Sequence, residues 1–253
     1  MAVVTQAYQQ NNTLKMKIEL HPSSDRGYAD HGWLKTFHNF SFATYFNPLR
    51  ERFGCLRVLN SDSITGGTGF DLHPHNNMEI TTIMLDGALK HRDSMGNEKV
   101  INKGEVQVMS AGTGIYHAEF NNSPSENAEL FQIWIFPRSK NLISRYDQRS
   151  FDLDKTKNTI TKLVVPDYEK TDTTLYIQQD AYISAIDADI SKTQHYSLNK
   201  TGNGTFVMVA AGTAEVEGNI LHKGDAIAVS ETEIFTFKTQ PGAQLYFIEV
   251  PMQ

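Results

Sequence analysis

Four side chains with metal-binding chemistry occur in two pairs that share one spacing. His73 and His75 are separated only by Pro74, and Glu119 follows His117 by two residues. In an extended strand, residues two apart point to the same side. Each pair therefore predicts two ligands on one face of a strand. Three imidazoles and one carboxylate, without a thiolate, suit a divalent transition metal with open positions.

Proline between the first two histidines supports an extended backbone. It biases its predecessor toward that geometry and donates no ladder hydrogen bond, so His73–His75 should lie at a strand end or edge. Spacing alone leaves a second interpretation open, in which these histidines are surface or turn residues and Glu119 is solvated. His91 lies in HRDSMGN at an expected hairpin and is interpreted as a hydrogen-bonded turn residue. Cys55 is interpreted as a buried small apolar residue.

The elements that must position these residues are strands. Short segments rich in β-branched and aromatic residues, bounded by turn residues, dominate the sequence, and helical periodicity is scarce. This pattern predicts an all-β fold of the barrel or sandwich type. The turn at 94–97 predicts a hairpin. The expected strands are 55–60, 79–85, 89–93, 98–101, 106–109, 115–120 and 130–136, followed by 175–179, 181–186, 205–211, 214–217, 226–229, 234–238 and 245–250.

A polar, charged segment separates these two runs of strands. Residues 137–157 read PRSKNLISRYDQRSFDLDKTK and are interpreted as the crossing between two halves. The sequence therefore predicts an N-terminal domain at 1–138 and a C-terminal domain at 139–253.

Bulk composition limits the classes of function. The chain has 253 residues, a net charge of −6 and one cysteine. The acidic balance argues against direct nucleic-acid binding, and one cysteine permits no intramolecular disulfide. The first residues, MAVVTQAYQQNN, lack the features of a signal peptide, and no apolar run is long enough for a membrane span. We therefore expect a cytoplasmic protein with no membrane association.

The motifs around both pairs resemble the pirin family, whose members are two-domain cupins. The resemblance rests on HPH followed by Glu79, then LDG, HRDSMGN and MSAGTGIYHAE, with GYADHGWLKTFHNFSFATYFNP before them and FQIWIFP and RYDQRSF after them. It is strong over residues 25–152 and covers the C-terminal half in outline. It implies two cupin (jelly-roll type) β-barrels in one chain.

The resemblance also bears on which carboxylate binds the metal. The general cupin pattern places the ligand shortly after His-x-His, which would select Glu79. The pirin pattern instead places it two residues after the last histidine, which selects Glu119. We favour Glu119 and interpret Glu79 as a supporting or structural residue. The implied metal ligands are then His73, His75, His117 and Glu119.

The two halves can be overlaid as distant repeats. Gly87 then falls on Gly212, and Gly104 on Gly224. Equal offsets from these glycines place non-ligating residues where the first half has its three histidines. Those residues are Leu198, Lys200 and Phe237. We therefore expect a single metal in the N-terminal domain and none in the C-terminal domain.

The resemblance implies a metal-dependent dioxygenase that opens the heterocycle of quercetin-like flavonols with O2 and releases carbon monoxide. Fe(II) is the expected metal, with Zn, Mn, Ni, Co and Cu as alternatives. Glu119 would act as the catalytic base that removes the proton of the flavonol 3-hydroxyl. The substrate would be a small flavonol-like aromatic. One alternative is a non-catalytic, metal-binding pirin that acts as a regulatory module and binds a protein partner; another is a storage or stress-response cupin without activity.

Overall fold

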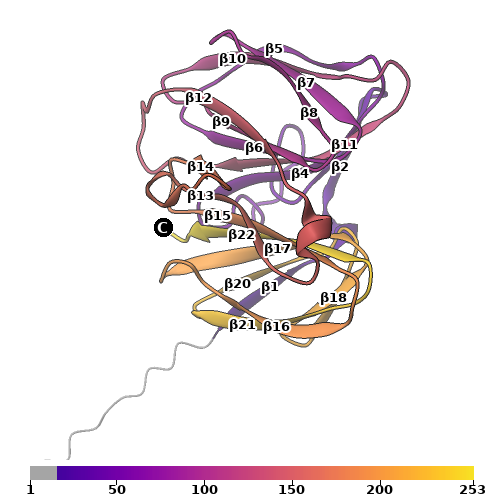
Figure 1. Ribbon diagram of the computed structural model, residues 1–253, viewed down its shortest axis with the longest axis vertical. Coiled ribbons are helices and arrows are strands. Elements are labelled where there is room, and N and C mark those ends of the chain that lie inside the picture. Colours follow the sequence, from indigo (N-terminus) through magenta and orange to yellow (C-terminus); the bar gives the residue numbers. More distant parts are fainter. Residues whose placement is uncertain (1–15) are drawn as a thin grey trace, which may run out of the picture.

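The computed structural model describes residues 16–253, which fold into two β-barrels stacked along the long axis of the molecule (Figure 1). The all-β prediction is confirmed. The helical elements of the described chain are short 3-10 turns at Ser23–Asp25, Leu153–Thr156 and Asp167–Glu169. None of the helices described there is long and apolar enough to cross a membrane. Residues 1–15, where no signal peptide is expected, lie outside the described residues.

The first barrel combines a seven-stranded sheet, in the order β12-β9-β6-β11-β4-β3-β2, with a four-stranded sheet, β5-β10-β7-β8. Its strands are β2 (Gly27–Asp30), β3 (Leu34–His38), β4 (Leu56–Ile64), β5 (Gly69–His75), β6 (Glu79–Asp86), β7 (Ala88–Asp93), β8 (Glu98–Asn102), β9 (Glu105–Ser110), β10 (Ile115–Asn121), β11 (Ala128–Ile135) and β12 (Arg145–Ser150).

The second barrel repeats this plan with sheets β1-β20-β17-β22-β15-β13-β14 and β16-β21-β18-β19. Its strands are β1 (Lys17–His21), β13 (Thr161–Pro166), β14 (Leu175–Ile177), β15 (Tyr182–Ala188), β16 (Lys192–Ser197), β17 (Asn203–Ala211), β18 (Thr213–Val216), β19 (Asn219–His222), β20 (Ala226–Ser230), β21 (Ile234–Thr239) and β22 (Ala243–Pro251).

The barrels exchange strands. β1, from the N-terminal end, pairs with β20 of the second barrel, and β12 pairs with β9 of the first (Figure 1). The interpretation of residues 137–157 as a simple crossing is therefore wrong for its middle third. β12 escaped detection because it is a polar, half-exposed edge strand without a buried apolar face. The domain boundary at residue 138 stays a prediction, and sheet pairing crosses it in both directions.

Alternating side chains on the large sheets face two different interiors. On β11, Phe131 and Ile133 pack in the core between the barrels, whereas Gln132 and Trp134 face the cavity of the first barrel. Across the interface Phe131 meets Tyr246 edge to face, with ring centroids 5.4 Å apart. Because both faces of the sheet are buried, its strands read as nearly continuous apolar runs with isolated polar residues. Those polar residues line the first barrel.

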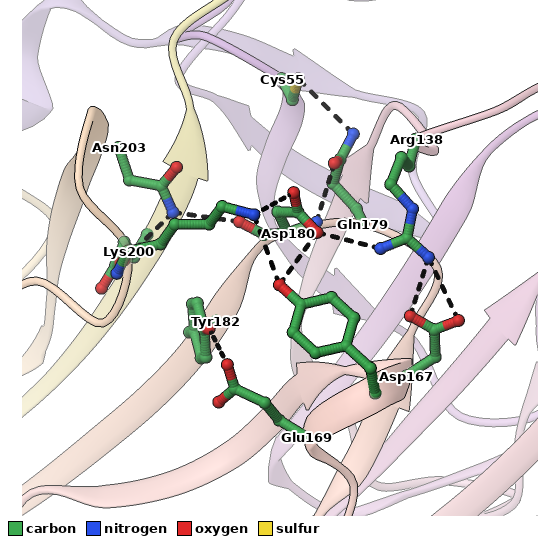
Figure 2. Close-up of polar contacts among 11 residues, drawn as sticks. Cys55, Arg138, Asp167, Glu169, Gln179, Asp180, Tyr182, Lys200 and Asn203 are labelled. Carbon is green, nitrogen blue, oxygen red and sulfur yellow. Dashed lines mark hydrogen bonds and ion pairs between the residues drawn. The ribbon is translucent and has the colours of Figure 1, made fainter.

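A polar network ties the end of the first half to the second. Figure 2 shows Arg138 between two carboxylates: it donates to Asp180 and to Asp167, each at 2.9 Å. Lys200 reaches the other oxygen of Asp180. This network connects the segment after β11 to the segment just before β15.

Candidate metal centre

Three histidines converge on the inner face of the four-stranded sheet. β5 and β10 pair antiparallel with His73 opposite His117, and His75 opposite Ile115. The ring centroid of His73 lies 4.8 Å from that of His75 and 4.4 Å from that of His117. One ring nitrogen of each histidine lies within 4.8 Å of the others. The structure therefore brings together three of the four predicted ligands as one group.

Proline and the edge position explain this arrangement on β5. β5 is the outer strand of its sheet, so the missing N–H of Pro74 leaves no gap between two paired strands. The Nδ1 of His73 lies 2.7 Å from the carbonyl oxygen of Asp71. A carbonyl only accepts, so His73 Nδ1 carries the proton and Nε2 presents its lone pair.

The charge state of the buried histidines also fits metal binding. Burial, followed by the neighbouring His117 and His73, lowers the pKa of His75 to about 4. Burial and the nearby His73 and His91 lower the pKa of His117 to about 3. Metal ligands must be deprotonated, so these imidazoles are in the form that binds a cation. Both ring nitrogens of His117 are buried without a hydrogen-bond partner, which is unfavourable unless a ligand occupies one of them.

The fourth predicted ligand lies beside His117. A register shift between His117 and Glu119 marks a bulge in the pairing with β5. Glu119 forms a second group with His91 and His117, whose ligand atoms lie within 4.8 Å of one another. Glu119 does not share one such group with His73 and His75. Its carboxylate accepts hydrogen bonds from Gln132 at 3.2 Å and from Gln107 at 3.5 Å.

Glu79 is placed elsewhere. Its Oε2 accepts a 2.7 Å hydrogen bond from the Ser110 hydroxyl, and it does not line the cavity in front of the histidines. Burial raises the pKa of Glu79 to about 7. This position agrees with a structural role for Glu79.

His91 occupies a more central place than a turn residue would. It is fully buried on β7, and its Nε2 lies 3.0 Å from Asp93 Oδ2. Its ring stacks on Tyr146, with centroids 4.5 Å apart. The hydrogen bond was expected, but the inward position was not. The alternation of Leu89, His91 and Asp93 with exposed Lys90 and Arg92 is the signal that could have found it.

A polar row crosses the inner face of the large sheet below the histidines. Successive strand pairings place five side chains side by side across the sheet, in the order Gln107, Thr82, Gln132, Asn60 and His38. Neighbouring side chains at both ends of this row are hydrogen bonded. Gln107 donates to Thr82 and Thr82 donates to Gln132, each at 3.3 Å. At the other end His38 Nδ1 lies 2.9 Å from Asn60 Oδ1. The two glutamines thus hold the Glu119 carboxylate from a rigid sheet.

A cavity of about 350 Å³ opens in front of the three histidines. Trp33, Phe42, Phe70 and Trp134 give it broad apolar walls. Asp62 lies on the opposite side, where burial raises its pKa to about 7 and its Oδ1 has no partner. The cavity suits a flat aromatic ligand with polar substituents.

The second barrel carries three aromatic residues and one leucine at the corresponding positions. The strand pairings of the two barrels can be compared residue by residue. Leu89 of β7 lies opposite Asn121 of β10 in the first barrel, and Ala214 of β18 lies opposite Thr239 of β21 in the second, so β10 corresponds to β21. Tyr196 then matches His73, Leu198 matches His75, Phe235 matches His117 and Phe237 matches Glu119. The predicted offsets were wrong by two residues because connecting turns differ in length.

These aromatic side chains fill the second barrel. Tyr196 stacks on Phe247, with ring centroids 4.8 Å apart, and packs beside Phe235. Its hydroxyl lies 3.0 Å from Glu249 and donates to it. Across residues 16–253, both groups of three metal-capable side chains lie in the first barrel. That the second domain binds no metal stays a prediction.

Comparisons with known proteins place this site in context. The sequence model of the Pirin family matches residues 19–135, and that of the quercetinase C-terminal cupin domain matches residues 163–250. The chain is 34% identical to quercetin 2,3-dioxygenase of Escherichia coli K12, over 92% of this chain and 99% of the relative. It is 38% identical to a pirin-like protein of Caulobacter vibrioides, over 92% and 99%.

Solved structures give the same result. The crystal structure of the bacterial pirin YhhW from Escherichia coli in complex with nickel(II) has a TM-score of 0.87 and 33% identity to this chain. The match covers 94% of this chain and all of that one. The similarity therefore extends across both barrels.

Proposed function

Because the chain belongs to the pirin family, we propose that it is a metal-dependent dioxygenase that cleaves quercetin-like flavonols. The observation that supports this best is the convergence of His73, His75 and His117 at one end of an aromatic-walled cavity, beside the Glu119 carboxylate. The reaction consumes flavonol and O2 and yields a depside and carbon monoxide. It needs no external reductant.

The proposed metal ligands are His73, His75, His117 and Glu119. The unpartnered nitrogens of His117 support them, as do the lowered pKa values of His75 and His117. Fe(II) is the proposed ion, with Zn, Mn, Ni, Co or Cu as alternatives; the related Escherichia coli pirin was crystallised with nickel(II). When bound, the ion supplies a Lewis acid that stabilises the flavonolate and supports its reaction with oxygen.

The chain's own residues then have separate tasks. Glu119 accepts the proton of the flavonol 3-hydroxyl, while Gln107 and Gln132 hold its carboxylate in place. Trp33 and Trp134 present apolar surface to the flat rings and exclude water. The cavity volume of about 350 Å³ lies in the ~300–1,000 Å³ range of small-molecule sites.

The two halves have different proposed roles. Residues 1–138 would supply the metal ligands, and residues 139–253 would form a domain without them. The aromatic cluster around Tyr196 and Phe235 supports this division because these two rings stand at the strand positions matched to His73 and His117.

Anaerobic reloading of metal-free protein with each divalent ion, followed by aerobic incubation with quercetin, tests the proposal. We expect loss of flavonol absorbance with stoichiometric carbon monoxide, and no turnover for His73→Ala. His195→Ala is the matched control, because His195 is an exposed histidine of the second barrel, and this variant should retain activity. Absence of quercetin turnover with every ion would refute the proposed dioxygenase activity. It would favour the alternative of a non-catalytic, metal-binding regulatory module.

A further inference from the structure

Three buried imidazole nitrogens in the first barrel have no hydrogen-bond partner. They are Nδ1 and Nε2 of His117 and Nδ1 of His91. The two residues are 1% and 0% exposed, so water does not satisfy these atoms from the surface. Buried polar atoms normally have partners, and three orphans on neighbouring rings need a common explanation.

Proton assignments supply that explanation. The Nε2 of His91 lies 3.0 Å from the Asp93 carboxylate, which only accepts, so Nε2 carries the proton. With the proton on Nε2, an unprotonated Nδ1 of His91 can accept a hydrogen bond. If one nitrogen of His117 binds the proposed metal, its other nitrogen carries a proton and needs an acceptor. A ring nitrogen of His91 lies within 4.8 Å of His117, and Nδ1 is the free one.

We propose that His91 is the positioning residue for His117 and completes a hydrogen-bonded chain from Asp93 through His91 to that ligand. This inference rests on the proposed metal site. His73 already follows the same rule, since its Nδ1 donates to the Asp71 carbonyl. A ligating histidine that donates its second N–H has a fixed tautomer and orientation and binds metal more strongly.

The surroundings of His91 hold it for this task. Asp93 is itself fixed, because its Oδ1 accepts from the backbone N–H groups of Met95 and Asn97 at 2.9 and 3.1 Å. Tyr146, from β12, stacks on the His91 ring, with ring centroids 4.5 Å apart. His91 is therefore held by a turn and by a strand from beyond the predicted domain boundary. The ring centroids of His91 and His117 lie 5.4 Å apart.

Glu119 is the competing partner of His91, since it belongs to the same group of ligand atoms. A carboxylate would require a protonated Nδ1 on His91. The two arrangements therefore differ in one proton, which can be observed directly. Nitrogen-15 NMR of histidine-labelled, Zn(II)-loaded protein reports the protonation of each ring nitrogen. We expect His91 Nδ1 to be unprotonated and His117 to carry one N–H; a proton on His91 Nδ1 would overturn the proposal.

Metal affinity provides the second readout. The variants are His91→Leu, which removes the acceptor, and His91→Gln, whose amide oxygen can replace it. We expect His91→Leu to weaken Zn(II) and Co(II) binding by about 10–100-fold, and His91→Gln to recover most of that loss. Thermal unfolding of the metal-free variants checks that each folds. Equal affinity for wild type and both variants would contradict the role of His91.

The same titrations separate this inference from the metal site. One outcome is that wild type binds Co(II), His73→Ala abolishes this binding, and the two His91 variants bind Co(II) as tightly as wild type. That outcome would support the metal site and refute the hydrogen-bonded chain through His91. Wild type that binds neither ion would overturn both.

Discussion

At the scale of single residues, the site combines neutral imidazoles with one held carboxylate. Burial lowers the pKa of His75 and His117, so neither needs to lose a proton near neutral pH before binding a cation. Glu119 accepts hydrogen bonds from the side-chain amides of Gln107 and Gln132, which fix the direction of its carboxylate. The donor set thus prepares both metal binding and proton removal.

Glu119→Gln should separate these two tasks. The amide cannot accept the substrate proton, so we expect flavonol turnover to fall by about 10²–10⁴-fold. The three histidines should still retain bound Ni(II) or Co(II), with reduced affinity. Steady-state turnover and metal titration of the same preparation measure both effects. Turnover of Glu119→Gln near the wild-type rate would show that Glu119 is not the catalytic base.

Glu79→Gln should change the pH dependence of stability. Burial raises the pKa of Glu79 from 4.5 to about 7, so the folded state holds its proton more tightly than the unfolded chain does. Its contribution to the free energy of unfolding is full below about pH 4.5, falls as pH rises, and is lost above pH 7. Glutamine does not titrate, so the Glu79→Gln variant does not lose this stability as the pH rises. Urea unfolding near pH 5 and pH 8.5 should show it gaining, relative to wild type, on the order of 1–3 kcal/mol at the higher pH. Parallel pH profiles for the two proteins would contradict this account.

At the scale of elements, the turn before β10 sets where His117 and Glu119 lie. Gly112 in this turn has φ +49°, and a Cβ there would meet the Leu142 carbonyl oxygen at 2.2 Å. Its own carbonyl accepts from Asn77 N–H at 2.9 Å, which links this turn to the one before β6. A displacement here would therefore be transmitted to the metal ligands.

Gly112→Ala tests this dependence. We expect a loss of stability on the order of 1–3 kcal/mol from the strained backbone, with a further loss from the close contact, and weaker Co(II) binding. Gly96→Ala is the matched control: Gly96 has φ +91° but no neighbour within 4 Å of an added Cβ. It should lose stability through backbone strain alone and keep wild-type metal affinity. Thermal unfolding and Co(II) titration of both variants make the comparison.

At the scale of the whole molecule, the two barrels depend on each other. Their large sheets share one core, in which residues such as Phe131 and Tyr246 meet, and each sheet includes a strand from across the predicted boundary at residue 138. Removing either half would expose this core to water. We therefore expect the barrels to unfold as one cooperative unit even though their sequences resemble separate repeats.

A fragment of residues 1–138 should consequently fail to fold as a soluble domain. It lacks β12, including Tyr146 against His91, and leaves the outer face of β11 uncovered. Amide NMR dispersion and thermal unfolding, with the full chain as reference, measure this. A fragment with a cooperative transition and wild-type Co(II) affinity would show that the first barrel is independent.

The sequence by itself predicted most of the strands from β4 onward, although not β12, β13, β16 or β19, and it indicated the four candidate ligands. A period of two is a local property, so the pairs around Pro74 and Ala118 could be recognised without knowing which strands are neighbours. Tertiary structure decided what lies across from them. Strand pairing places His73 opposite His117, turns His91 inward beside it and brings β12 back to the first barrel. These relations join residues far apart in the chain, and register between distant strands depends on packing and turn lengths that no local pattern records.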